Sequence, residues 1–238
     1  MKELRIIHLF PKLLSLYGEY GNLAVLKKSL EENGHKVDLV HYEDGDLDLT
    51  GADLVYVGSG TEDNLVEAAR RLTPWQEAIR QSVEADTHWL VTGNAMALFG
   101  AQLTVDGENV PALNVLSYTT TLQRAKRYIG DVLGKDAQGQ WFVGFVNTAN
   151  VYTGTENNWL QLELNPKLGN DKQSAADGVV YRNFIGTQLI GPILAKNPHM
   201  LTRLCRELTG EEIALSPDSN ICKAYEICLR ELRNRLNP

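Results

Sequence analysis

The sequence predicts an α/β fold in which a mostly parallel sheet carries helices on both of its faces. Three short apolar runs, at residues 4–9, 53–57 and 88–92, have the length of buried strands rather than of helices. Amphipathic segments with helical spacing separate these runs. Strands that alternate with helices pair in parallel, because each helix carries the chain back across the sheet. The 238 residues, of which 43% are hydrophobic, can build a stable core without disulfides, so we expect a single domain over residues 1–238.

The first half of the chain contains this alternation. Residues 4–9 are the first expected strand, and Asn22 is expected to cap a helix that ends at Gly34. Residues 35–42 alternate apolar and polar side chains, as a half-buried strand does. The remaining expected elements of this half are a strand at 53–57, a glycine-rich loop at 58–61, helices at 62–72 and 74–84, and a strand at 88–92.

An abrupt turn follows the last of these strands. Gly93 and Asn94 come directly after the largely apolar run 89–92, and the small and apolar residues 95–100 favour a helix. A buried strand that enters a helix through a tight turn places one residue at the carboxyl edge of the sheet, where α/β enzymes bind their ligands. In enzymes with such an elbow that residue is the nucleophile. Here it is Gly93, which has no side chain.

The second half of the chain has a different character. Residues 106–109 predict a hairpin turn, and residues 118–129 are rich in threonine and basic side chains. A strand at 141–146 is expected to end just before Asn147. Further expected elements are strands at 179–184 and 187–189 and helices at 198–208 and 220–236.

Composition narrows the classes of partner and site. The net charge of -7 and the pI near 5.3 argue against a nucleic-acid partner, because phosphate binding needs a basic surface. The three cysteines form no metal-binding or disulfide pattern, and no apolar run is long enough to cross a bilayer. The loop 58–61 lacks the lysine of a P-loop and the full dinucleotide-binding glycine pattern. We therefore expect a cytoplasmic protein with no membrane insertion, no metal and no cofactor.

Three segments carry a family resemblance. Residues 186–198 include Gly-Thr-Gln-Leu-Ile-Gly-Pro, residues 16–22 read Leu-Tyr-Gly-Glu-Tyr-Gly-Asn, and residues 92–100 form the elbow. The chain resembles class I glutamine amidotransferase domains of the cobyric acid synthase (CobB/CobQ) type, and among them the glutaminase subunit of lipid II isoglutaminyl synthase. The resemblance implies a three-layer, flavodoxin-like class I glutamine amidotransferase fold.

The same resemblance locates the site. The family's elbow, Ile-Cys-Gly-Gly-Tyr-Gln-Leu-Leu-Gly, aligns without a gap on residues 92–100. Its catalytic Cys then falls on Gly93, its catalytic His on Ile190, and a Gln that helps to hold the substrate on Ala97. The remaining pocket candidates implied by the resemblance are Gly58, Ser59 and Gly60, whose backbone N–H groups would serve an oxyanion hole, together with Asn94, Arg127 and Asn147. A solvated surface charge is the alternative interpretation of Arg127.

These substitutions predict that glutamine hydrolysis is lost. A glutaminase of this class needs a thiolate to attack and an imidazole to accept its proton, and neither glycine nor isoleucine supplies them. By resemblance, we expect a pseudoglutaminase that binds a Mur-ligase-like, ATP-dependent subunit in amidation of the peptidoglycan stem D-glutamate. The partner of such a complex would bring a lipid-linked substrate.

Two alternatives remain open from the sequence. Shifting the elbow alignment by one residue puts Thr92 on the Cys position, which would make the chain an amidohydrolase with a substituted nucleophile. A threonine nucleophile needs a base, and neither Ile190 nor the neighbouring Gln188 supplies one. The pocket could instead bind an unrelated small ligand through polar residues such as Ser59, Asn94 and Thr148.

Overall fold

The central element is a six-stranded sheet in which all but one strand run parallel. The computed structural model describes residues 1–236. The strand order is β13-β14-β4-β3-β1-β2, and only β13 is antiparallel to its neighbour. This confirms the predicted mostly parallel sheet. Its strands are β1 (Glu3–Leu9), β2 (Lys36–Tyr42), β3 (Leu54–Val57), β4 (His88–Thr92), β13 (Val179–Tyr181) and β14 (Phe184–Thr187).

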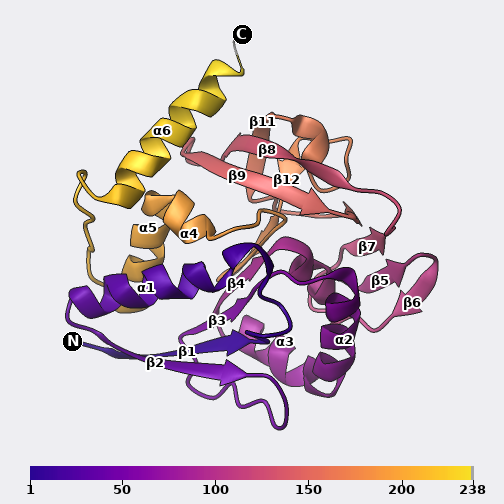
Figure 1. The fold of residues 1–238 in the computed structure, drawn as a ribbon. Helices are drawn as coiled ribbons and strands as arrows, with labels where there is room; N and C mark the ends of the chain where they lie inside the picture. Colours follow the sequence, from indigo (N-terminus) through magenta and orange to yellow (C-terminus); the bar gives the residue numbers. More distant parts are fainter. Residues whose placement is uncertain (237–238) are drawn as a thin grey trace.

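Helices cover both faces of this sheet (Figure 1). Along β3 the side chains alternate, so that Leu54 and Tyr56 join one buried cluster whereas Val55 and Val57 join the other. The first cluster contains side chains of α1 (Tyr20–Glu32), α4 (Ile193–Lys196) and α5 (Pro198–Thr209). The second contains side chains of α2 (Glu62–Leu72), α3 (Gln76–Glu84) and the 3-10 helix η3 (Gly93–Phe99).

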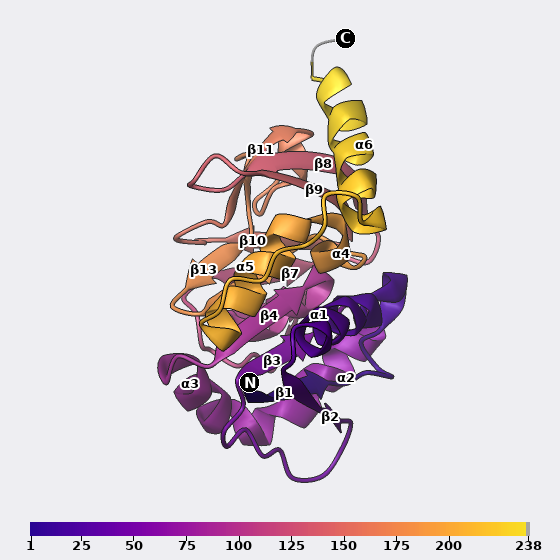
Figure 2. The ribbon, with the colours of Figure 1, turned by 90° about the vertical axis from the view of Figure 1, so that its left-hand side faces the viewer.

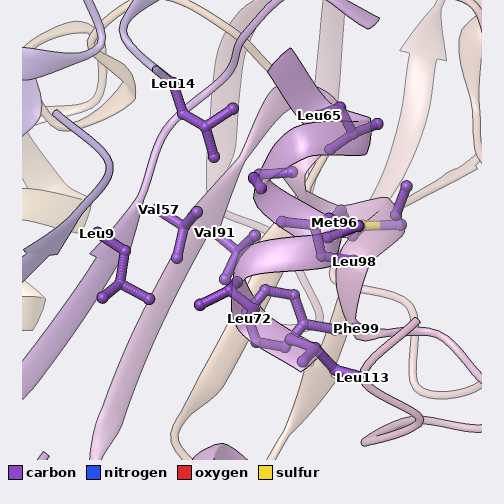
Figure 3. Close-up of a cluster of buried hydrophobic side chains, with 14 of the residues drawn as sticks. Leu9, Leu14, Val57, Leu65, Leu72, Val91, Met96, Leu98, Phe99 and Leu113 are labelled. Atoms are coloured by element: carbon purple, nitrogen blue, oxygen red, sulfur yellow. The ribbon is translucent and has the colours of Figure 1, made fainter. Parts of the chain in front are cut away.

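The segment after β4 is buried throughout. Figure 3 shows Met96, Leu98 and Phe99 of η3 packed among side chains of the sheet and of α2, with Val91 and Leu65 close by. Every residue from 93 to 99 is buried. The segment that carries the elbow is therefore part of the core, and a change of volume there will be felt by the sheet and by α2.

The second half of the chain adds two four-stranded sheets. One has the order β10-β7-β5-β6 and the other β12-β11-β8-β9, and α6 (Asn220–Asn234) lies along β8 and β9 up to the C-terminal end (Figure 2). The strands of these two sheets are β5 (Gln102–Val105), β6 (Glu108–Val110), β7 (Thr119–Leu122), β8 (Tyr128–Lys135), β9 (Trp141–Thr148), β10 (Asn150–Thr153), β11 (Leu160–Leu164) and β12 (Ala176–Asp177). The short 3-10 helices elsewhere in the chain are η1 (Leu16–Gly18), η2 (Thr73–Trp75) and η4 (Pro166–Leu168). That all three sheets form a single domain stays a prediction.

Several expected boundaries were wrong. Asn22 does not cap α1, which begins at Tyr20; its side chain instead donates to Tyr56 Oη at 2.9 Å and accepts from the Leu194 N–H at 3.0 Å. The strand expected at 179–184 is instead the hairpin of β13 and β14, and β14 ends at Thr187, where a further strand to 189 was expected. The strand expected at 141–146 continues to Thr148. In each case contacts with distant segments outweigh the local signal. Among residues 1–236, no helix combines the length and the apolar character that crossing a bilayer needs.

Candidate functional site

The predicted strand-to-helix turn lies at Gly93. Thr92 ends β4 with extended dihedral angles, whereas Gly93 has a φ of +64° and begins η3. A positive φ is costly for residues with a Cβ, so this backbone shape favours glycine. The turn places Gly93 at the carboxyl edge of the sheet, next to Ser59 of the glycine-rich loop and Ile190. Gly93, Ser59 and Ile190, three of the positions that the resemblance assigns to the site, therefore lie next to one another.

The space beside Gly93 is filled by its neighbours. A Cβ atom on Gly93 would lie 2.5 Å from Ser59 Cβ, closer still to Ser59 Oγ, and 2.8 Å from Ile190 Cγ2. Non-bonded carbon atoms are normally about 3.5–4.0 Å apart, so no side chain fits at position 93 without movement of these residues. The exposed fractions of Ser59 and Ile190 are only 2% each. The volume that a nucleophile would need is already occupied.

The backbone N–H groups of an oxyanion hole are also engaged. In an elbow of this kind the hole is built from the N–H after the nucleophile and an N–H from a neighbouring loop. Here the Asn94 N–H points to Ser59 Oγ at 3.4 Å, and the Gly60 N–H donates to Asn94 Oδ1 at 3.0 Å. Asn94 also donates through Nδ2 to the Gly60 carbonyl at 2.7 Å. The Asn94 side chain thus ties the elbow to the glycine-rich loop.

The position to which the resemblance assigns a histidine carries the aliphatic side chain of Ile190. Ile190 is held by its backbone, whose N–H donates to the Phe145 carbonyl at 2.9 Å. The neighbouring Gln188 turns its side chain into a buried network, accepting from Lys172 Nζ at 2.6 Å and donating to Asp177 Oδ1 at 3.2 Å. Burial lowers the pKa of Lys172 to about 8 and raises the pKa of Asp177. These contacts stabilise the loop before Ile190, and they direct its polar groups into the network.

A buried carboxylate contacts Thr92, and sequence reasoning missed it. Glu19 accepts hydrogen bonds from the Thr92 hydroxyl, from Tyr56 Oη at 2.6 Å and from the Gly191 N–H at 2.7 Å. Burial raises the pKa of Glu19 to about 7. The signal was available, because Glu19 lies inside the segment 16–22 that carries the family resemblance. Both Glu19 and Thr92 have no exposed surface, so their contact is internal to the fold.

The remaining candidates lie in different elements. Ala97 is fully buried in the hydrophobic cluster beneath η3. The guanidinium of Arg127 pairs with Glu62 Oε1 at 2.7 Å, at the first turn of α2, and its side chain is 37% exposed. Asn147 lies in β9 opposite Ile129, and its buried Oδ1 has no hydrogen-bond partner within residues 1–236. Among residues 1–236, no group of three His, Cys, Asp or Glu side chains is placed to hold a metal ion.

Comparisons with known proteins identify the family of the chain. Residues 5–198 match the CobB/CobQ-like glutamine amidotransferase domain family. The chain is 27% identical over 221 residues to the lipid II isoglutaminyl synthase (glutamine-hydrolyzing) subunit GatD of Streptococcus pneumoniae (strain ATCC BAA-255 / R6), covering 90% of this chain and 85% of that protein. It is also 27% identical over 215 residues to the GatD subunit of Staphylococcus aureus (strain N315), covering 86% of each.

Solved structures share the fold. A crystal structure of a glutamine amidotransferase superposes with a TM-score of 0.56 at 16% identity, covering 86% of this chain and 99% of that one. PurLQS from Thermotoga maritima superposes with a TM-score of 0.53 at 14% identity, covering 87% and 96%. The flavodoxin-like amidotransferase fold expected from the sequence is thereby confirmed. Because the family match spans most of the chain and includes both the elbow and Ile190, the chain belongs to the CobB/CobQ-like glutamine amidotransferase domain family.

Proposed function

We propose that this chain is a non-hydrolysing glutamine amidotransferase-like subunit, a pseudoglutaminase, that binds a Mur-ligase-like, ATP-dependent partner. The observation that carries this proposal is the filled space at Gly93, where Ser59 and Ile190 occupy the volume of a nucleophile. The relatives named as subunits of lipid II isoglutaminyl synthase support amidation of the peptidoglycan stem D-glutamate as the reaction of the complex. The partner would then take free ammonium, or depend on this subunit for stability or regulation.

The chemistry of the elbow supports the same proposal. Loss of a nucleophile alone typically costs about 10⁴- to 10⁶-fold in rate, and here the aligned base position is aliphatic as well. The N–H groups of Gly60 and Asn94 are engaged with protein acceptors, so the residual contribution of an oxyanion hole is reduced too. A cytoplasmic location and the absence of a nucleic-acid partner follow from the composition as part of this proposal.

Glutamine hydrolysis is expected to stay at background. The assay follows glutamate release by the purified chain, alone and mixed with a Mur-ligase-like protein from the same organism, with glutamine as the only nitrogen source. The Streptococcus pneumoniae relative, whose name describes it as glutamine-hydrolyzing, is the positive control. Background rates together with stable co-purification of the pair would support the proposal, and glutamate release at a rate near that of the control would refute it.

A second candidate function rests on Thr92. Its hydroxyl donates to the Glu19 carboxylate, so an acid–base partner exists for it. The competing observation is burial, because neither side chain has exposed surface through which a substrate could reach it. If glutamate is released and Thr92→Ala abolishes the release, the chain is an enzyme with a substituted nucleophile.

An exposed apolar patch beside the elbow supports partner binding. Tyr20 is 66% exposed, Tyr17 43% and Leu16 37%, and the three lie within five residues. Tyr17 has a φ of +60°, a strained conformation that is found preferentially at functional sites. The same segment contacts the glycine-rich loop beside the elbow, since the Leu16 N–H donates to the Ser59 carbonyl at 2.9 Å. Exposed tyrosines are frequent energetic centres of protein interfaces, so we assign this patch to the partner.

Removing the two tyrosines is expected to weaken partner binding by at least about 100-fold, because two interface anchors of about 2 kcal/mol each would be lost. The double variant Tyr17→Asn/Tyr20→Ala suits the backbone, since asparagine tolerates a positive φ. Ile227→Ala is the matched control, because Ile227 is 54% exposed on α6. Affinities of the purified pair are measured by biolayer interferometry. An affinity of the double variant equal to that of the control would exclude the patch as the interface.

A further inference from the structure

A cavity of about 430 Å³ lies at the opposite end of β4 from the elbow. It is lined by His88, where β4 begins, by Ile185 near the start of β14, and by Leu204 of α5. The turn between β8 and β9 closes it on another side through Ala137 and Gln138. Its volume falls within the range of about 300–1,000 Å³ that small-molecule sites have. The elbow at Gly93 contributes nothing to this cavity.

The cavity combines an apolar floor with an aromatic side chain. Leu90, Met200 and Leu204 line it and belong to the buried cluster on the α5 face of the sheet. Trp159 also lines it, is only 4% exposed, and packs edge-on against Phe142 with ring centroids 4.8 Å apart. The indole Nε1–H of Trp159 has no acceptor within residues 1–236. Such a floor favours a flat, largely apolar ring.

Carboxylates outnumber arginines around the cavity. Arg203 lies 3.7 Å from an Asp136 oxygen and 3.8 Å from a Glu207 oxygen. Arg182 lies 3.2 Å from a Glu84 oxygen and 3.3 Å from an Asp86 oxygen. An anionic ligand would have to break one of these pairs to gain a counter-charge, and it would also meet the excess of carboxylates. The cavity therefore favours an uncharged group over an anionic one.

Neutral polar groups remain free for a ligand. Within the described residues, the side-chain amides of Gln138 and Asn157 make no hydrogen bond, although both residues line the cavity. Burial lowers the pKa of His88, which keeps its imidazole neutral at pH 7. Amides and a neutral imidazole can each donate and accept, as the edge of a heteroaromatic ring does. The apolar floor, the aromatic side chain and the neutral amides together suit an uncharged, planar ligand with polar edges.

We propose that this cavity is a binding site, separate from the amidotransferase elbow, for an uncharged planar heteroaromatic molecule with hydrogen-bonding edges, the chemistry of a nucleoside. The ring lies on the floor formed by Leu90, Met200 and Leu204, and its polar edge faces Gln138 and Asn157. The site is independent of whether the elbow hydrolyses glutamine, so failure of one proposal leaves the other standing.

The test measures binding of uridine and adenosine to the full chain by isothermal titration calorimetry. Molecules of this size are expected to bind with a Kd of about 0.1 to 1 mM. Uridine 5′-monophosphate is expected to bind no more tightly than uridine, because the arginines of the rim are already paired. Tighter binding of the nucleotide would overturn the assignment of an uncharged ligand, and absence of binding by both nucleosides up to about 10 mM would overturn the site.

Two variants locate the binding. Ala137→Trp places an indole in the cavity from a surface turn and is expected to weaken binding at least ten-fold, whereas Gln138→Ala removes one amide and is expected to weaken it about three-fold. The matched control is Ala224→Trp, which adds the same side chain at an exposed position of α6 outside this cavity. Nucleoside affinity that is unchanged in both cavity variants, or lowered equally by the control, would place the binding elsewhere and refute the proposal.

Discussion

Replacing Gly93 by cysteine is expected to lower the free energy of unfolding by about 3 kcal/mol and to leave glutamine hydrolysis at background. The new Cβ would lie 2.5 Å from Ser59 Cβ and 2.8 Å from Ile190 Cγ2, so the core around the elbow must shift to admit it. Overpacking of a core costs about 1–3 kcal/mol, and a Cβ at a φ of +64° adds about 1 kcal/mol. Urea denaturation of the unmodified protein and of the Gly93→Cys variant measures the difference in the free energy of unfolding.

Gly154→Cys is the matched control for the backbone cost alone. Gly154 has a φ of +78°, and nothing lies within 4 Å of a Cβ built on it, so this variant is expected to lose only about 1 kcal/mol. Adding Ser59→Gly to the Gly93→Cys protein removes the closest clashing atoms and is expected to restore about half of the lost stability. A Gly93→Cys protein as stable as the Gly154→Cys control would mean that the elbow has room for a nucleophile.

The second large effect concerns Glu19 and pH. Burial raises the pKa of Glu19 to about 7 in the folded protein, from about 4.5 in an unfolded chain. Its contribution to the free energy of unfolding is therefore complete below pH 4.5 and is lost as the pH rises through 7. A shift of this size corresponds to about 3 kcal/mol. Relative to Glu19→Gln, which stays neutral, the unmodified protein is expected to lose about that much stability between pH 4.5 and 8.

The difference in the free energy of unfolding between the unmodified protein and the Glu19→Gln variant isolates the contribution of Glu19. Burial lowers the pKa of His8 and that of His199 to about 4, so both add stability that is lost as the pH falls from 6.5 towards 4, the opposite direction. These contributions are common to both proteins and cancel. Urea denaturation at half-unit pH steps supplies the two curves. Parallel curves from pH 4.5 to 8 would show that Glu19 titrates normally, which would contradict its burial among Thr92, Tyr56 and Gly191.

Much of the fold could be predicted from local patterns. The strand-to-helix turn at Gly93 and the parallel pairing of β1, β3 and β4 follow from apolar runs of strand length that are separated by helical spacing. The boundaries that failed are those where a distant segment intervenes. Asn22 looks like a helix cap in the sequence, but Tyr56 and Leu194 engage its side chain inside the first turn of α1.

The sequence predicted which positions belong to the candidate site, but not which side chains contact one another there. Aligning the elbow with the family located Gly93 and Ile190, and both meet at the carboxyl edge of the sheet. The role of Ser59 in filling that space could not be predicted, because Ser59 lies on a separate loop whose distance from the elbow depends on the pairing of β3 with β4. Glu19 was missed for the same reason, since it is 73 residues from Thr92 and 172 from Gly191 in the chain.

By itself, the sequence determined which residues stand at the positions that the resemblance singles out, Gly93 and Ile190, and that Gly93 lies between a strand and a helix that neighbouring residues specify. Only the tertiary structure decided that the space beside Gly93 is occupied by Ser59 and Ile190 and that Glu19 is buried against Thr92. The physical reason is that helix and strand preferences act over a few residues, whereas packing volume and desolvation depend on atoms that only folding brings together.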